Sequence, residues 1–157
     1  MPAVGSLALA EAGPLDEPFL AELFLAVRPF LALTGLDQPQ LEGLVGMQRR
    51  AQRSGYERQW PGYRQLVARV DGEPVATIAR ADAPDLVHIL DIAVLPTAQG
   101  RGIGTALLTA VLDEAGTAVQ LSVAPDNPAR RLYERLGFVV VGSGNADLLM
   151  LWRGRAR

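Results

Sequence analysis

The stretch from Leu90 to Gly116 constrains the fold of this 157-residue chain more than any other part. It begins with an apolar, β-branched run that is typical of a buried central strand. Pro96 ends that run, because proline has no N–H to donate to a sheet ladder. A glycine-rich turn from Gln99 to Gly104 follows, and apolar residues then recur at helical spacing up to Gly116, a typical helix stop. The sequence therefore predicts a strand, a glycine turn and an amphipathic helix.

This order of elements aims several backbone N–H groups at one point, where the helix dipole adds positive potential and a phosphate can bind. Two common phosphate loops do not fit the turn. A P-loop needs Lys and then Ser or Thr after its last glycine, but Thr105 and Ala106 follow Gly104. The dinucleotide fingerprint, counted from Gly100, needs a glycine where Thr105 stands. A tight turn without a ligand is the alternative.

Composition narrows the class of protein. With 15 basic and 17 acidic residues, the chain has no positive excess for nucleic acid. It has no cysteine, which excludes disulfides and a cysteine nucleophile and fits a cytoplasmic location, and the one histidine, His88, cannot form a metal site alone. No apolar run approaches the roughly 20 residues of a membrane helix. The segment from Met1 to Gly13 has no basic residue before its apolar part, so we do not expect it to be a secretory signal. We expect one soluble, cytoplasmic domain over residues 1–157, without a metal or a membrane partner.

The remaining patterns predict an α/β fold with a mixed sheet and helices on both faces, in the order β-α-α-β-β-β-α-β-α-β-β. The expected strands are 4–10, 64–70, 74–80, 86–95, 117–124, 138–141 and 147–152, and the expected helices are 16–28, 39–54, 103–115 and 127–136. Glu22 and Arg28 are expected on the exposed side of the first helix. Arg49, Arg50 and Arg53 are expected in the last turn of the second, where cations complement the helix dipole.

An aromatic patch, Tyr56, Trp60 and Tyr63, follows the second predicted helix. Its three rings are consistent either with a small satellite core beneath a loop or with one wall of a pocket for a second substrate. The residues alone do not separate these two interpretations.

Two motifs in the right order resemble the GNAT superfamily of N-acetyltransferases. Gln99-x-x-Gly102-x-Gly104, after a strand that ends in Val-x-Pro, is similar to the loop that binds the pyrophosphate of acetyl-CoA. The second motif, NPARRLYERLGF, runs from Asn127 to Phe138. The resemblance is sharp over residues 89–138 and topological before that. It implies the GNAT-like fold with a splayed central sheet.

The resemblance also implies acetyl-CoA as cosubstrate, with its pyrophosphate on the amides of the turn and its pantetheine arm along the central strand. On this basis Ile92 N–H is expected near the thioester oxygen. The cofactor-binding residues that the resemblance implies are Ile92, Ala93, Val94, Gln99, Gly100, Arg101, Gly102, Ile103, Gly104, Thr105, Asn127, Arg130 and Tyr133. The residues alone also predict that Asn127 caps the helix that follows it.

For catalysis, the resemblance assigns Tyr133 as the general acid, although its spacing also fits a core tyrosine. His88 stands eleven residues before Gln99, where relatives keep a carboxylate base, and its unperturbed pKa near 6.5 suits a base. Asp91, on the same strand, is the competing candidate for the base, and strand alternation predicts that it faces the opposite side from His88. If Asp91 is not the base, it is expected to be a buried, hydrogen-bonded structural carboxylate. A chain of water molecules without a side-chain base is the third option.

The sequence therefore predicts an acetyl-CoA-dependent N-acetyltransferase. Without a cysteine for an acetyl-enzyme, direct transfer to a primary amine in a ternary complex is the expected mechanism. The amine, on a small molecule or on a peptide or protein, is expected to bind between the first two helices, the aromatic patch and the loop Gly142–Asn145. A homodimer is compatible with the resemblance. The alternative is a non-catalytic domain that binds acyl-CoA as a sensor or scaffold.

Overall fold

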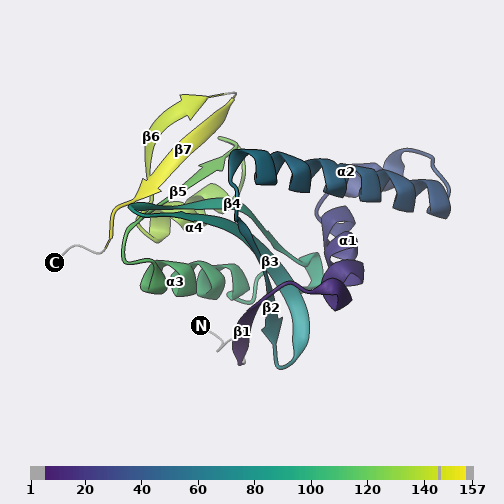
Figure 1. The fold of residues 1–157 in the computed structure, drawn as a ribbon, viewed down its shortest axis with the longest axis horizontal. Helices are drawn as coiled ribbons and strands as arrows, with labels where there is room; N and C mark the ends of the chain where they lie inside the picture. The colour runs from purple at the N-terminus through teal and green to yellow at the C-terminus, as the bar shows by residue number, and fades with distance from the viewer. Residues whose placement is uncertain (1–5, 145, 155–157) are drawn as a thin grey trace.

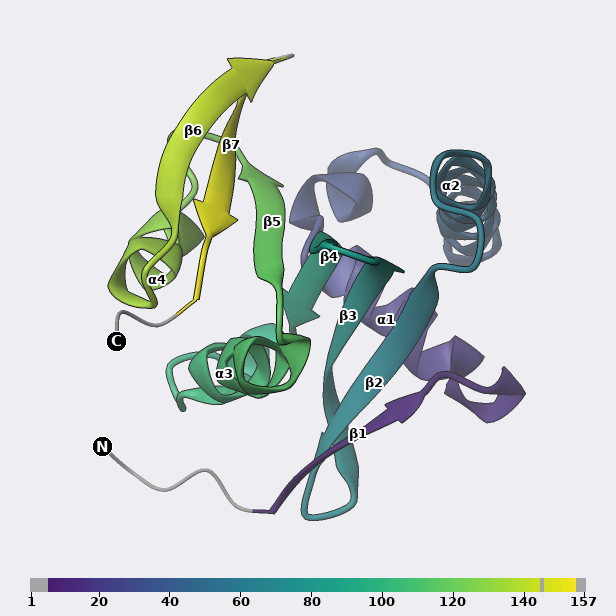
Figure 2. The same ribbon diagram turned by 60° about the vertical axis from the view of Figure 1, so that its left-hand side comes forward.

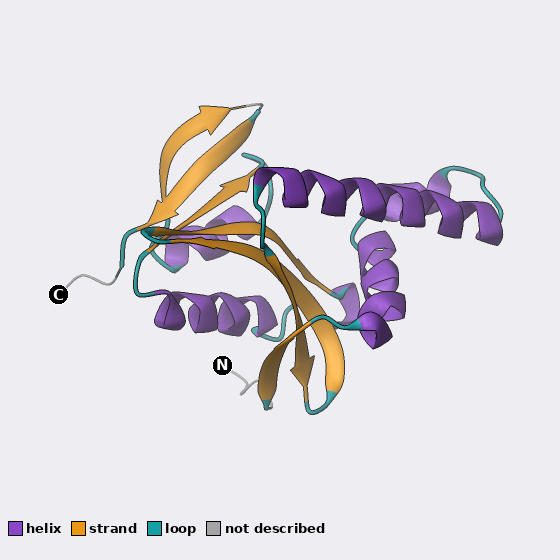
Figure 3. Cartoon of the chain, in the orientation of Figure 1, coloured by secondary structure: helices purple, strands orange, loops and turns teal. Residues whose placement is uncertain are grey.

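The computed structural model describes residues 6–144 and 146–154, which form a seven-stranded mixed sheet with helices on both faces (Figures 1 and 3). The strands are β1 (Leu7–Glu11), β2 (Arg64–Val70), β3 (Glu73–Ala83), β4 (Leu86–Val94), β5 (Ala118–Val123), β6 (Val139–Gly144) and β7 (Asp147–Trp152). The α-helices of this part of the chain are α1 (Glu17–Ala26), α2 (Gln38–Gln59), α3 (Ile103–Ala115) and α4 (Ala129–Arg135). The predicted element order and the mixed sheet are confirmed.

Across the sheet the strands lie in the order β1-β2-β3-β4-β5-β7-β6. β3 is covered on both faces, and every residue from Val75 to Ala81 is buried. α1 contacts β3 and β4 on one face, and α3 packs against β4 and β5 on the other (Figure 2). α2 follows α1 and reaches beyond the end of the sheet (Figure 1). Among the described helices, none is long and apolar enough to span a membrane.

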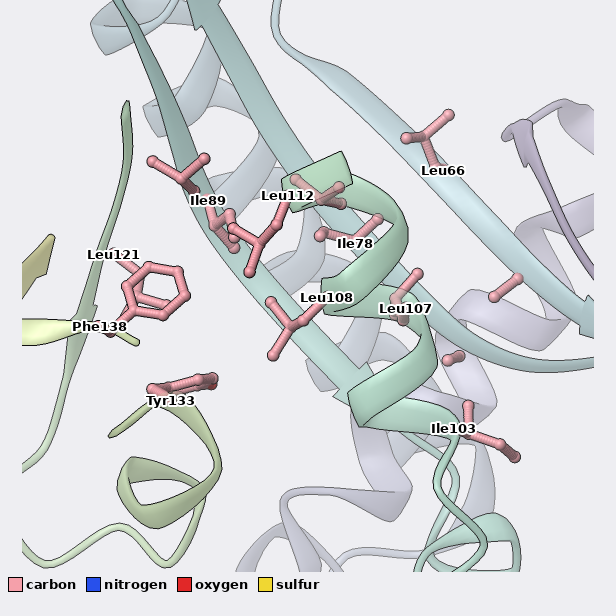
Figure 4. Close-up of a cluster of buried hydrophobic side chains, with 14 of the residues drawn as sticks. Leu66, Ile78, Ile89, Ile103, Leu107, Leu108, Leu112, Leu121, Tyr133 and Phe138 are labelled. Carbon is pink, nitrogen blue, oxygen red and sulfur yellow. The ribbon is translucent and has the colours of Figure 1, made fainter. Parts of the chain in front are cut away.

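The main core lies between the sheet and α3. Leu107 and Leu108 of α3 are fully buried and point toward the strands that carry Ile78 and Ile89, while Phe138 closes the core from the β5–β7 side (Figure 4). A smaller cluster joins the first two helices and consists of Phe24, Leu31, Leu41 and Val45.

The sheet opens between β4 and β5. These parallel strands pair only at Leu86–Ala118, Val87–Val119 and His88–Gln120. Beyond His88, β4 continues to Val94 and β5 continues to Val123, but neither pairs with the other, and β5 turns toward β7 (Figure 2). The edge of β4 from residue 89 onward is thus unpaired on the β5 side, which confirms the predicted splayed sheet.

A β-bulge lies in β4 next to the opening. Asp91 pairs with Ala79 and Ile89 pairs with Arg80, so Leu90 has no partner on β3. The extra residue resets the alternation of side chains along β4. His88, opposite Ala81, and Asp91, opposite Ala79, therefore share one face of the sheet. The prediction that they face opposite sides was wrong, because it assumed an uninterrupted strand.

The second helix is longer than predicted. α2 runs through Gly55 to Gln59 instead of ending at Ser54, since one glycine inside a helix costs only about 1 kcal/mol. Arg49 and Arg53 therefore lie inside α2 and not in its last turn, so the dipole interpretation was wrong for them.

The arginines of α2 connect it to α1. Arg49 Nη1 lies 2.9 Å and Arg53 Nη1 3.3 Å from the carboxylate of Glu17, at the start of α1. At the other end of the chain, β6 extends to Gly144, into the predicted loop Gly142–Asn145. Asn145 and residues 4–5 of the first predicted strand lie outside the described residues.

Candidate active site

A groove of about 780 Å³ lies beside the unpaired end of β4, between this strand and α4. Its walls are the unpaired edge of β4, the glycine turn before α3, and the first part of α4. All but one of the residues that the resemblance implies for the cofactor line it: Ile92, Ala93, Val94, Gln99, Gly100, Arg101, Gly102, Ile103, Gly104, Thr105, Asn127 and Tyr133. The exception is Arg130, whose Nε lies 3.4 Å from Glu134 on the same helix. The structure thus brings two separate motifs to one groove.

The glycine turn gives this groove an anion-binding end. Gly100 and Gly102 have φ angles of +78° and +79°, a left-handed conformation that glycine adopts without strain. Gly102 caps α3 without any side-chain hydrogen bond, and the first amide to bond back within this helix is that of Ala106. The amides of the first turn of α3 are therefore available to an anion, where the helix dipole favours negative charge.

Tyr133 lies in the wall of the groove opposite β4. Its side chain is 6% exposed, its ring packs edge-to-face on Phe138 with 6.0 Å between centroids, and it extends from α4 toward β4 and α3 (Figure 4). Burial, together with the charge of Asp91, raises the pKa of the Tyr133 hydroxyl, which stays protonated near neutral pH. Beside it, Asn127 Oδ1 accepts a hydrogen bond of 2.9 Å from Ala129 N and so caps α4, as its position predicts.

Asp91 lies where the groove meets a second cavity. It lines the groove and also a chamber of about 170 Å³ beneath α1 and α2. Burial raises the pKa of this carboxyl group, while the charge of Arg28 and the backbone N–H of Ile92 partly oppose that rise. A carboxylate with a raised pKa is a stronger proton acceptor than an exposed one, and this one is accessible from both cavities.

His88 is positioned differently. Its imidazole packs against the Trp60 indole, with 4.1 Å between ring centroids, and it is not among the described residues that line the groove or the chamber. Burial lowers the pKa of His88, so the ring is neutral near pH 7. The structure therefore gives His88 a packing contact and Asp91 the access to both cavities.

The aromatic patch combines the two interpretations offered for it. Trp60 covers His88, whereas Tyr63 lines the chamber and packs edge-to-face on Tyr56 with 5.4 Å between centroids. The Tyr56 hydroxyl donates a 3.3 Å hydrogen bond to the carbonyl of the bulged Leu90. Burial and the Asp91 charge raise the pKa of Tyr56 to about 12. The patch supports the bulge and forms part of the chamber wall.

Sequence reasoning missed two arginines at this site. Arg28 was expected to be exposed, but it is half-buried and lines the chamber, because the chain after α1 turns toward β4. Arg135 lines the groove from the end of α4, and no site role was assigned to it from the sequence. The local pattern contains no signal for either position, since both depend on how a helix end docks on the sheet.

The mixed sheet opens beside a helix N-terminus, and a groove and a chamber next to this opening share a carboxylate, which places two potential ligand cavities side by side. The sequence model of the acetyltransferase (GNAT) family matches residues 32–138. The chain belongs to this family, and it is an N-acetyltransferase.

Known proteins agree with this placement. The chain is 34% identical over 143 residues to L-2,4-diaminobutyric acid acetyltransferase of Nocardia farcinica, which covers 79% of this chain and 74% of the relative. An acetyltransferase from Thermus thermophilus superposes with a TM-score of 0.71 at 25% identity, over 96% of this chain and 98% of the other. The PaiA N-acetyltransferase of Thermoplasma acidophilum, solved with coenzyme A, has the same fold: TM-score 0.69, 16% identity, and coverage of 94% and 99%.

Proposed function

We propose that this enzyme transfers an acetyl group from acetyl-CoA directly to a primary amine while both are bound. One observation carries the proposal: the groove and the chamber are neighbours whose walls share Val27, Asp91 and Ala93. Two substrates bound in these two cavities would meet at the Asp91 carboxylate. The absence of cysteine from the chain agrees with direct transfer.

The residues of the groove fit acetyl-CoA. The amides of the first turn of α3 would bind the pyrophosphate, with Arg101 and Arg135 as nearby positive charges. The unpaired edge of β4 at Ile92 and Val94 offers backbone groups to the amides of the pantetheine arm. Both features recognise the invariant part of the cosubstrate and leave its acetyl end near Asp91.

Asp91 is the base in this proposal, and Tyr133 is the proton donor. The amine nitrogen attacks the thioester carbonyl carbon as its proton passes to Asp91, and the C–S bond breaks as the C–N bond forms. The sulfur takes a proton from the Tyr133 hydroxyl, which burial keeps protonated. Ile92 N–H interacts with the Asp91 carboxylate in this structure, and in the proposed complex it would donate to the carbonyl oxygen instead. His88 serves as a packing partner of Trp60.

The acceptor binds in the chamber. The named substrate of the Nocardia relative, L-2,4-diaminobutyric acid, is a diamine with a carboxylate, and 34% identity supports it as the first acceptor to test.

The direct test follows thiol release from acetyl-CoA with a panel of small amines, and product mass identifies the acetylated nitrogen. Calorimetry with coenzyme A on the same preparation measures binding separately from turnover. We expect coenzyme A to bind and at least one amine to be acetylated, which adds about 42 mass units because an acetyl group replaces a hydrogen atom. The acetylated product should form at about the same rate as the free thiol. Binding of coenzyme A without acetylation of any amine would instead support an acyl-CoA sensor.

A further inference from the structure

The chamber beneath α1 and α2 has an excess of positive charge. Among the described residues that line it, the cations are Arg28, Arg49 and Arg53, and the carboxylates are Glu17 and Asp91. Its volume of about 170 Å³ suits a small molecule. The acceptor is therefore small, and its own charge has to fit a confined space in which charges interact more strongly than in water.

Two of the three arginines already have a partner. Arg49 Nη1 and Arg53 Nη1 lie 2.9 and 3.3 Å from the two carboxylate oxygens of Glu17. The Arg49 side chain is 13% exposed, whereas the Glu17 side chain that it contacts is 45% exposed. This triad connects α1 to α2 and leaves little binding capacity for a ligand.

Arg28 differs from both. Its Nη1 donates a 3.2 Å hydrogen bond to the Phe24 carbonyl, and its guanidinium carbon lies 3.6 Å from the centroid of the Phe24 ring. Within residues 6–144 and 146–154, no carboxylate lies at ion-pair distance from it. The guanidinium is thus held in one orientation at the wall of the chamber. Its charge acts on Asp91 from beyond ion-pair distance, so its hydrogen-bond donors are not taken up by an acid.

We propose that Arg28 binds a carboxylate of the acceptor, and that the substrates of this enzyme are small amines that carry a carboxylate, in the manner of amino acids. A planar guanidinium matches a carboxylate with two parallel hydrogen bonds. Asp91, in the same chamber, faces the amine. This inference rests on the proposed function, because Asp91 is assigned there as the base.

The opposite charges of Asp91 and Arg28 make the chamber selective for a molecule that carries both an amine and a carboxylate. An amino acid brings its reacting amine to Asp91 and its carboxylate to Arg28. A diamine without the carboxylate brings a second cation to a chamber that already has an excess positive charge, and it leaves Arg28 without a partner. Charge of like sign in a confined site opposes binding, so the decarboxylated analogue is the sharpest comparison.

The test compares amines that differ only by the carboxylate: 2,4-diaminobutyrate with 1,3-diaminopropane, ornithine with putrescine, and lysine with cadaverine. We expect kcat/KM at least about tenfold higher for the carboxylate member of the best pair, equivalent to about 1.4 kcal/mol. Arg28→Gln is expected to reduce that ratio to about one, mainly by raising the KM of the amino acid, and Arg28→Lys to restore part of it. Arg50→Gln, which removes the same charge from an exposed arginine of α2 that lines neither cavity, is expected to retain the ratio.

Three results would overturn the inference. The first is equal use of both members of every pair by the native enzyme. The second is an unchanged ratio in Arg28→Gln. The third is a lower ratio in Arg28→Gln that comes only from faster use of the diamine, with the KM of the amino acid unchanged, which would mean that Arg28 repels diamines without binding the carboxylate. If no amine is acetylated, the proposed function fails. In that case, each amino acid and its matching diamine are titrated separately into the complex with coenzyme A, and calorimetry measures which one binds more tightly. Equal binding of the two, or no binding of either, overturns the inference that Arg28 binds a carboxylate.

Discussion

At the scale of single residues, Asp91 and His88 provide a direct comparison of two candidate bases. Asp91→Asn keeps the size of the side chain and removes its basicity, and we expect kcat to fall about 10²–10⁴-fold. His88→Gln removes a ring that packs on Trp60, and we expect kcat to change less than about threefold. Steady-state rates at pH 7.5 measure both variants. A larger loss in His88→Gln than in Asp91→Asn would reverse the assignment.

The pH dependence gives a second measurement on the same variant. Because the pKa of Asp91 is raised, the folded protein holds this proton more tightly than the unfolded chain does. The ionised carboxylate therefore lowers the free energy of unfolding at pH values above its folded pKa, and this penalty disappears as the pH falls toward the ordinary aspartate value. We expect Asp91→Asn to raise Tm at pH 7.5 and to have a smaller effect near pH 4. The native enzyme, in turn, should gain activity with rising pH through the raised pKa.

Most residues of the groove were predictable from the sequence, and the residues of the chamber were not. The turn residues Gln99–Thr105 and the helix around Tyr133 belong to contiguous motifs, whose local pattern already determines a strand, a turn and a helix start. The orientation of Asp91 depends on the bulge at Leu90, which arises from pairing with β3. The position of Arg28 depends on where the end of α1 docks on the sheet. Local patterns contain no information on such long-range contacts.

At the scale of elements, the two ends of α3 allow a matched test of the glycine turn. Gly100 precedes the helix at φ +78° and lines the groove, and Gly116 follows it at φ +62°. A Cβ at either position meets no described heavy atom within 4 Å. We expect Gly100→Ala and Gly116→Ala to lower the free energy of unfolding by a similar amount, about 1 kcal/mol, from the left-handed backbone.

Only Gly100→Ala is expected to weaken binding of coenzyme A, by about tenfold or more, since the added methyl group stands in space that the ligand requires. Calorimetry measures the two dissociation constants, and urea unfolding measures stability. Equal affinities in the two variants would place the pyrophosphate away from the turn.

The end of α2 shows why element boundaries were harder to predict than element order. Gly55 was expected to stop α2, but the helix continues for one more turn. That turn brings Tyr56 to the carbonyl of Leu90. The tertiary contact outweighs a local propensity of about 1 kcal/mol. Periodicity determined the type and order of elements because it extends over many residues, whereas each end depends on a single contact.

At the scale of the whole molecule, the opening between β4 and β5 divides the sheet into two parts joined by three residue pairs and a common core. A ligand that bonds to β4 and to the start of α3, and that also touches α4, would connect both parts. We expect coenzyme A at about 100 times its dissociation constant to add about 2.7 kcal/mol to the free energy of unfolding, or about 5–10 °C in Tm. Thermal unfolding with and without coenzyme A measures this shift, and no shift at that concentration would contradict binding in the groove.

The unpaired edge of β4 has one further consequence for the enzyme at work. In the proposed mode of binding, the backbone and the helix terminus grip the part of the cosubstrate that is unchanged by the reaction. Free coenzyme A therefore competes with acetyl-CoA for the same groove, and catalysis slows when acetyl-CoA becomes scarce relative to coenzyme A. The missing strand partner of β4 would in this way make the rate of the enzyme depend on the ratio of acetyl-CoA to free coenzyme A.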